Sequence, residues 1–489
     1  MNYLLRAEAV NLDNFVYDTN KIQPTRGGSF LLLDSVQQLY GKTIAGIKLK
    51  KITTGASIGL YSFSTNDNVE AEKVVNAVHT ELTSITKSHA TFAVACIEDT
   101  GDFKADLLKL QTKVRWQQYQ QPTLILPDEK NAKEECAFDG VRPGVVEIHL
   151  PGKKLVVSDS VDFRINAENK KLREKIYSRI LNEQISYKFT KDIEKLANHK
   201  DMGNLNNKIA FIYLDGNKFT KIRNSLCDNS TELTNFSDTV ETARSEFLAA
   251  LLAKAEKDKT FKTEDEEIRF ETLLWGGDEL EIIVPAWQGW AVLHLFFDAM
   301  KDVHFKKKPD DEAPLTHAGG IVFCNCKAPI REIRRMAHEL SDMAKDAIKP
   351  AFETIESIKT QVTHEKHDTF HFLVLESFDT VGGKVKFFAQ NYFGKTIWQS
   401  MMITQEDMGK LTSVIKFMKD NAFPRNKIFD IVRAIKQNQF NQSIVDNALA
   451  DNTMSKDIVD KINIFLGNKI ERWFVISELW DYVCVGGAQ

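Results

Sequence analysis

The sequence has few of the residues that interrupt or crosslink a chain. Its 489 residues include only 24 Gly, 11 Pro and six Cys. So little Gly and Pro excludes collagen-like and low-complexity sequence, and an apolar content of 43% excludes intrinsic disorder. No two cysteines form a CxxC pair, so neither a disulfide framework nor a regular zinc module is specified.

An excess of charge and a long hydrophobic run are also missing. The 64 Lys and Arg against 68 Asp and Glu give a net charge of −4, which excludes a histone-like coat for nucleic acid. The longest apolar runs, 209–214 and 291–297, are far shorter than the ~20 residues that cross a bilayer. The first residues show no secretory signal. We therefore expect a cytoplasmic chain with reduced thiols.

Strand and helix patterns alternate in the first hundred residues. Apolar runs of strand length lie at 3–10, 47–63 and 91–97, and stretches of helical period lie at 30–40 and 69–85. Gly55 breaks the middle run into two strands, so the predicted order is βαββαβ. This is the order of a ferredoxin-like split βαβ unit.

The same order returns in the second half of the chain. Predicted strands lie at 209–214, 268–275, 280–284 and 320–324, with helical patterns at 240–252 and 290–300. From Thr404 onward the pattern is helical. We predict an α+β fold with two ferredoxin-like units and a helical C-terminal domain. The expected domains are 1–128, a polar helical segment 129–205, 206–395 and 396–489.

The two units differ at the turn between their second and third strands. The first has Thr54-Gly55-Ala56-Ser57, and the second has Gly276-Gly277-Asp278-Glu279. We interpret the units as an internal duplication in which only the second copy keeps carboxylates. The first copy is then expected to be structural or to support a second nucleotide, without metal ligands.

Carboxylates of the second unit are expected to converge. Its first strand ends in Asp215-Gly216-Asn217, and a βαββαβ sheet places that strand beside the hairpin that carries Asp278 and Glu279. Three carboxylates so close repel one another, and a divalent cation with oxygen ligands relieves that repulsion. The paired glycines would allow positive φ at the turn and a close approach of a phosphate.

This arrangement suits phosphoryl or nucleotidyl transfer with two Mg²⁺ ions. Lys345, on the polar side of a helix that begins near Pro329, is the candidate cation for a triphosphate. Another glycine pair, Gly27-Gly28, predicts either an anion-binding loop or a turn with Ser29 as a helix N-cap.

These residues resemble a known family. Tyr213-Leu214-Asp215-Gly216-Asn217 together with Gly276-Gly277-Asp278-Glu279 is similar to the palm domain shared by GGDEF nucleotide cyclases and the large polymerase/cyclase subunit of type III CRISPR effector complexes. Three further segments favour the CRISPR branch: Arg26-Gly27-Gly28-Ser29-Phe30-Leu31-Leu32, Asp139-Gly140-Val141-Arg142-Pro143 and Val157-Ser158-Asp159-Ser160.

The resemblance implies synthesis of a cyclic oligonucleotide, cyclic oligoadenylate, from ATP. It implies Mg²⁺ or Mn²⁺ held by Asp215, Gly216, Asp278 and Glu279, and a nucleotide bound by Gly216, Asn217, Phe219, Gly276, Gly277 and Lys345. It also implies protein subunits, guide RNA and target RNA as partners. Two alternatives stay open: a catalytically silent scaffold of the ribonucleoprotein, and a free-standing signalling cyclase that needs no guide RNA.

The sequence departs from the family pattern at four places. No HD nuclease domain is expected, because the first palm pattern starts at residue 3. Zinc is doubtful as a cofactor, because the inter-palm segment has Cys136 as its single cysteine. The turn reads GGDE in place of GGDD, which keeps the charge. At the position where GGDEF cyclases use Asn to recognise guanine, this chain has Arg223, which makes a guanine-specific cyclase less favoured.

Overall fold

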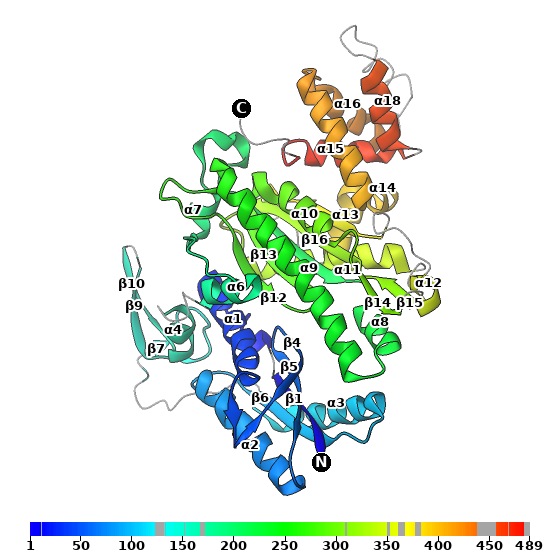
Figure 1. Ribbon diagram of the computed structural model, residues 1–489. Helices are drawn as coiled ribbons and strands as arrows, with labels where there is room; N and C mark the ends of the chain where they lie inside the picture. The colour runs from blue at the N-terminus through cyan, green and yellow to red at the C-terminus, as the bar shows by residue number, and fades with distance from the viewer. Residues whose placement is uncertain are drawn as a thin grey trace.

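The structure is a computed structural model, and its fold is mixed α+β (Figure 1). It describes residues 1–10, 12–122, 132, 134–150, 152–166, 172–308, 311–349, 353–359, 367–376, 383–437, 456–467 and 469–483.

The N-terminal sheet follows the predicted order of elements. They are β1 Asn2–Ala9, α1 Ile22–Leu39, β4 Lys50–Gly55, β5 Ile58–Ser64, α2 Asn68–Ile85 and β6 Phe92–Glu98. A short hairpin, β2 Thr43–Ile44 and β3 Ile47–Lys48, precedes β4. The four long strands are ordered β4-β5-β1-β6, and every pair is antiparallel.

Period-2 alternation gives this sheet two covered faces. Tyr3 and Leu5 of β1 belong to one buried cluster with α1 and α2, whereas Leu4 belongs to a second cluster with α3 Phe103–Gln120. Helix α3 lies after the six predicted elements and covers the second face of β1 and β6 (Figure 1).

The glycine pair in α1 has a different role from the predicted one. Gly27 and Gly28 lie inside α1, which begins at Ile22, so Ser29 is not an N-cap and the pair forms no anion-binding loop. Close packing explains the glycines, because a Cβ on Gly27 would lie 1.9 Å from the carbonyl oxygen of Arg164.

Strands accompany the helices between the two large sheets. The elements of this segment are β7 Glu134–Glu135, β8 Pro143–Gly144, β9 Val146–Leu150, β10 Lys153–Val157, α4 Asp159–Ile165, α6 Leu172–Leu181 and α7 Ile193–Ala197. The segment predicted as helical therefore contains helices, and it also contains strands that the sequence pattern did not indicate. This segment has a small core of Cys136, Val157 and Val161. Two of its arginines, Arg142 and Arg164, connect it to the N-terminal unit by ion pairs with Asp18.

The second large sheet has six strands in the order β12-β13-β11-β16-β17-β18. Its elements are β11 Lys208–Gly216, α8 Phe219–Leu226, α9 Ser230–Lys257, β12 Glu271–Trp275, β13 Glu279–Pro285, α10 Ala286–Met300, β16 His317–Asn325, α11 Ile330–Ile348, β17 Thr369–Val374 and β18 Ile403–Thr404. A hairpin, β14 His304–Lys308 and β15 Asp311–Pro314, lies beside it.

Helices cover both faces of this sheet. A Cβ on Gly289 of α10 would touch the side chains of Ala210 and Phe323, and a Cβ on Gly320 would touch the Ala337 carbonyl of α11. Since α10 and α11 pack on opposite faces, β11 is buried on both, as its continuous apolar run predicts.

Helices dominate the C-terminal part, and those after Thr404 stand at the top of Figure 1. They are α12 Ile355–Lys359, α13 Val385–Phe393, α14 Lys395–Ser400, α15 Gln405–Asp420, α16 Arg425–Lys436, α18 Lys456–Leu466 and α19 Trp473–Leu479. The predicted start at Thr404 is confirmed, since its side chain accepts a hydrogen bond from the Asp407 amide. Among the helices of the described ranges, none is long and apolar enough to span a membrane.

Candidate active site

The predicted carboxylates lie at one end of the second large sheet. Strand β11 pairs with β13 so that Asp215 stands directly opposite Glu279. Asp278 precedes Glu279 in the turn, and its carbonyl accepts a hydrogen bond of 3.1 Å from the Gly216 amide. The strand order thus brings the end of one strand beside the next hairpin, as the sequence predicts.

Burial, and after it the charge of neighbouring carboxylates, raises the pKa values of Asp215 and Glu279. Burial raises the pKa of Asp215, Lys345 lowers it by attraction and hydrogen bonding, and Asp278 raises it again. The pKa of Glu279 is also raised, first by burial and then by the charge of Asp215. The predicted Lys345 reaches the site and forms an ion pair with Asp215 Oδ2.

The three carboxylates do not form a ready ligand cluster. Within the described ranges, no group of three or more His, Cys, Asp or Glu side chains is placed to hold a metal ion. The donor chemistry still fits Mg²⁺, because Asp215 and Glu279 are oxygen donors with raised pKa values that share one hydroxyl, that of Tyr213. Lys345 is the counter-charge that now offsets Asp215.

Two hollows adjoin at this point, and together they are lined by all nine predicted site residues. An open groove is lined by seven of them: Asp215, Gly216, Asn217, Phe219, Asp278, Glu279 and Lys345. Three further lysines line this groove, Lys218, Lys221 and Lys349. Gly276 and Gly277 line a neighbouring cavity of about 270 Å³, which shares Phe219, Thr220 and Asp278 with the groove.

The predicted nucleotide-binding residues Gly276, Gly277 and Asn217 have different structural roles. Neither Gly276 nor Gly277 has positive φ, so that expectation is wrong. A Cβ on Gly276 would lie 3.2 Å from the Glu279 carbonyl, whereas Gly277 faces open space. The amide of Asn217 donates to Thr316 Oγ1 and to the His367 carbonyl, so this side chain holds its own loop.

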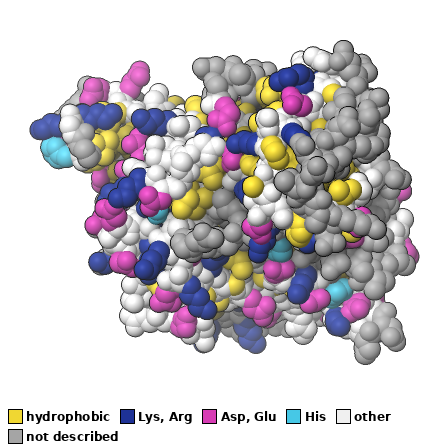
Figure 2. All heavy atoms as spheres, turned by 90° about the horizontal axis from the view of Figure 1, so that it is seen from above, with side chains coloured by type: hydrophobic (Ala, Val, Ile, Leu, Met, Phe, Trp, Pro, Cys, Tyr) yellow, Lys and Arg dark blue, Asp and Glu magenta, His cyan; other side chains and the backbone are white. Residues whose placement is uncertain are grey.

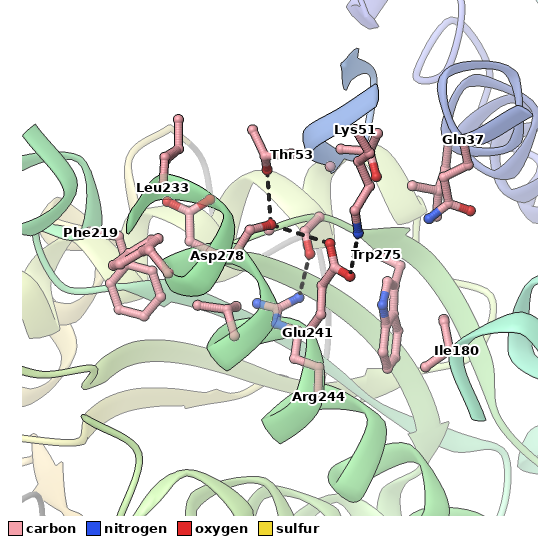
Figure 3. Close-up of a pocket in the computed structure, with 18 of the residues that line it drawn as sticks. Gln37, Lys51, Thr53, Ile180, Phe219, Leu233, Glu241, Arg244, Trp275 and Asp278 are labelled. Atoms are coloured by element: carbon pink, nitrogen blue, oxygen red, sulfur yellow. Dashed lines mark hydrogen bonds and ion pairs between the residues drawn. The ribbon is translucent and has the colours of Figure 1, made fainter. Parts of the chain in front are cut away.

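The N-terminal unit closes the cavity (Figure 3). Thr53 of β4 bonds Ser237 of α9 at 2.9 Å, and Lys51 pairs with Glu241 at 3.2 Å. The Thr54-Gly55-Ala56-Ser57 turn of the N-terminal unit lies against the GGDE turn. A Cβ on Gly55 would be 3.3 Å from the Gly277 nitrogen. Phe236 and Trp275 add aromatic wall to the cavity, which is therefore composite.

Arg244 is a site residue that sequence reasoning missed. It lies in α9, is 1% exposed, and donates from Nη1 to the carbonyls of Gly276 (3.0 Å) and Glu279 (2.6 Å). Burial lowers its pKa to about 10, against the attraction of Asp278 and Glu279. Its Nε and Nη2 have no hydrogen-bond partner, and the residue lines the cavity. Nothing in the local helical pattern marks it.

Solved structures of Csm1 are similar to this chain. A Csm1-Csm4 cassette in complex with cA4 is 14% identical with a TM-score of 0.43, and covers 71% of this chain and 53% of its own. Csm1 from T.onnurineus is 15% identical with a TM-score of 0.41, and covers 71% and 51%.

A third structure, the Csm1-Csm4 subcomplex in the type III-A CRISPR-Csm interference complex, gives 14% identity, a TM-score of 0.43, and the coverage of the first. The chain thus spans about half the length of the Csm1 chains. No family model matches the sequence, and the search of curated proteins gave no match.

Proposed function

We propose that the chain is a nucleotidyl transferase that makes cyclic oligonucleotides from ATP, as the large subunit of a type III CRISPR ribonucleoprotein. The observation that carries this proposal is the meeting of Asp215, Asp278, Glu279 and Lys345 in a groove that opens into an aromatic-walled cavity. The proposal also includes the interpretation of both large sheets as palm domains and the division of the chain into 1–128, 129–205, 206–395 and 396–489.

The groove has the charges that a triphosphate requires. Lys218, Lys221, Lys345 and Lys349 line it beside the carboxylates. We assign the triphosphate to these lysines and the purine base to the adjoining cavity, between Phe219, Phe236 and Trp275. The ribose then lies near Asp278, which both hollows share.

Asp215, Asp278 and Glu279 would hold the divalent cations. When bound, Mg²⁺ lowers the pKa of an attacking hydroxyl and neutralises the phosphates. A ribose hydroxyl of one nucleotide gives its proton to solvent and attacks the α-phosphorus of another. The new phosphodiester bond forms as the bond between the α- and β-phosphates breaks, and pyrophosphate leaves. Lys345 is free to turn from Asp215 to the triphosphate once a cation takes its place as counter-charge.

The partners follow from the surface as well as from the resemblance of the motifs. On the face shown in Figure 2, Lys and Arg side chains lie interspersed with Asp and Glu. Among the described residues of that face, the two signs of charge are mixed, so they set up no large field of one sign that would attract RNA over a long range. We therefore assign most of the RNA contact to protein partners.

Labelled ATP tests the proposal directly. The chain is incubated with Mg²⁺ or Mn²⁺, alone and with its co-purifying subunits and RNA, and products are separated by size. We expect oligomers or cyclic products that Asp278→Asn abolishes and that Asp298→Asn, an exposed change on α10, leaves intact. Product from the isolated chain, with no nucleic acid bound, would favour the free-standing cyclase.

A silent scaffold is the second candidate, and one observation favours it: among the described residues there is no ready metal cluster, and Lys345 already pairs with Asp215. Lys345→Met separates the two functions. In a cyclase it raises the KM for ATP by roughly 10-fold or more, since a charge-assisted contact to phosphate is lost. In a scaffold, ATP binding is absent with and without the substitution. Lys301→Met, at the end of α10, is the matched control.

A further inference from the structure

Tyr213 joins the two carboxylates that face each other across β11 and β13. It lies two residues before Asp215, on the same face of the strand, and is 4% exposed. Its hydroxyl donates to Glu279 Oε1 at 2.9 Å and lies 3.3 Å from Asp215 Oδ2. One phenol therefore restrains both side chains.

The ring of Tyr213 is itself held in place. It stacks on the imidazole of His338, with centroids 3.5 Å apart and planes 14° from parallel. The His338 Nε2–H donates to Glu281 Oε1 at 2.9 Å. Because Glu281 is the cross-strand partner of Tyr213, the stack and the carboxylate lie on one face of the sheet, under α11.

Glu281 is buried and fully engaged. Its side chain has no exposed surface, and it accepts hydrogen bonds from Arg334 Nε at 2.7 Å and from the Tyr17 hydroxyl at 3.3 Å as well as from His338. It lines neither the groove nor the cavity. An ion pair with Arg334 alone would satisfy its charge. The additional bond to His338 extends the cluster to the active carboxylates.

We propose that Tyr213 is a positioning residue that sets the carboxylates of Asp215 and Glu279 for a divalent cation, and that Glu281 acts through His338 to set Tyr213. This inference rests on the proposed function for the identity of the site. Groups that orient metal ligands from behind commonly change metal affinity by 10- to 100-fold when they are removed.

Mn²⁺ binding tests the inference apart from turnover. Free Mn²⁺ is measured by electron paramagnetic resonance in titrations of the wild type, Tyr213→Phe and His338→Ala, with Asp215→Asn to mark the site. Tyr187→Phe is the matched control, because the Tyr187 hydroxyl bonds Glu256 at an exposed position. Thermal unfolding and the kcat and KM for ATP are measured on the same proteins.

We expect Tyr213→Phe and His338→Ala to weaken Mn²⁺ binding by roughly 10-fold and to lower kcat, with KM for ATP changed less than about twofold. Tyr213→Phe should melt at the wild-type temperature. Unchanged Mn²⁺ affinity in Tyr213→Phe, equal weakening in Tyr187→Phe, or no Mn²⁺ binding by the wild type would overturn the inference. A wild type that binds Mn²⁺ and never forms product overturns the proposed function instead.

Discussion

Arg244 fixes the shape of the GGDE turn through its guanidinium group. It reaches from α9 to the carbonyls on either side of that turn, Gly276 and Glu279. Both carbonyls would otherwise lack a charged donor in a buried setting. The turn that carries Asp278 is therefore held from outside its own hairpin.

Arg244→Met should lower the free energy of unfolding by about 1–3 kcal/mol, because the buried Gly276 carbonyl loses its charged donor and the Glu279 carbonyl keeps only the Gly276 amide. It should also reduce product formation more than Arg223→Met, which removes an arginine from the same cavity without touching the turn. Chemical denaturation and the ATP assay check this. Equal loss of activity in both variants would contradict a role in shaping the turn.

Motif and strand order could predict the acidic residues of the site but not their supports. Asp215, Asp278 and Glu279 follow from a strand end and a turn, which are local signals. Arg244 occupies a position in α9 like any other on a helix face, and Tyr213 is one residue of an apolar strand. Their roles depend on contacts across 32 and 66 residues of sequence, which periodicity does not encode.

At the scale of elements, α1 meets α4 through a glycine. Alanine normally favours a helix over glycine by about 0.5–1 kcal/mol. At Gly27 we expect the opposite sign, because a Cβ there would overlap the Arg164 carbonyl and force the two helices apart. Gly27→Ala should destabilise the protein by about 1–3 kcal/mol.

Gly409→Ala is the matched control for that change. Gly409 lies inside α15, and a Cβ there meets nothing within 4 Å. It should raise the thermal midpoint while Gly27→Ala lowers it. Two variants that shift the midpoint in the same direction would show that the α1–α4 contact tolerates a methyl group.

The contact between β17 and α14 depends on a neutral histidine. The Phe372 amide donates to His371 Nδ1 at 3.0 Å, and Nε2 donates to the Trp398 carbonyl at 3.2 Å. Burial lowers the pKa of His371 to about 4, against an ordinary 6.5. Between these values the unfolded chain binds a proton that the folded chain does not, so stability is complete above pH 6.5 and is lost as pH falls towards 4.

That difference in pKa predicts a loss of about 3 kcal/mol over the window. Thermal midpoints measured from pH 7 to pH 4 should fall for the wild type and fall less for His371→Gln, which keeps a donor and an acceptor but does not titrate. Part of the fall in midpoint should remain in His371→Gln, because burial also lowers the pKa of His89 to about 4. Parallel curves for the two proteins would contradict this account of His371.

At the scale of the whole molecule, periodicity predicted most strands of both sheets and could not predict how the sheets meet. The strand patterns are local, and β1, β5, β6, β11 and β13 begin and end close to their expected residues. The units meet through polar side chains such as Thr53 and Ser237 and through apolar residues such as Ile52 and Phe236, which belong to one buried cluster. Periodicity shows which face of an element is apolar but not which element covers it, so the composite cavity was not predictable.

A buried charge cluster joins the N-terminal unit to the second sheet. Glu271 of β12 accepts from Arg26 of α1 and from Arg173 of α6 at 3.2 Å, and all three side chains are 4% exposed or less. Burial lowers the pKa of Arg173, and the charge of Glu271 acts in the opposite direction and raises it. Strand β12 leads directly into the GGDE turn, so this cluster lies at the base of the hairpin that carries Asp278.

Glu271→Gln should lower the free energy of unfolding by about 3–5 kcal/mol, because it leaves two buried guanidinium groups without a counter-charge. Glu241→Gln, which removes the half-exposed partner of Lys51, should cost about 1 kcal/mol or less. Thermal unfolding and limited proteolysis of the two variants compare the buried contact at Glu271 with the half-exposed contact at Glu241. If both variants melt together and are cut alike, the units are joined by apolar packing rather than by the Glu271 cluster, and the hairpin that carries Asp278 does not depend on it.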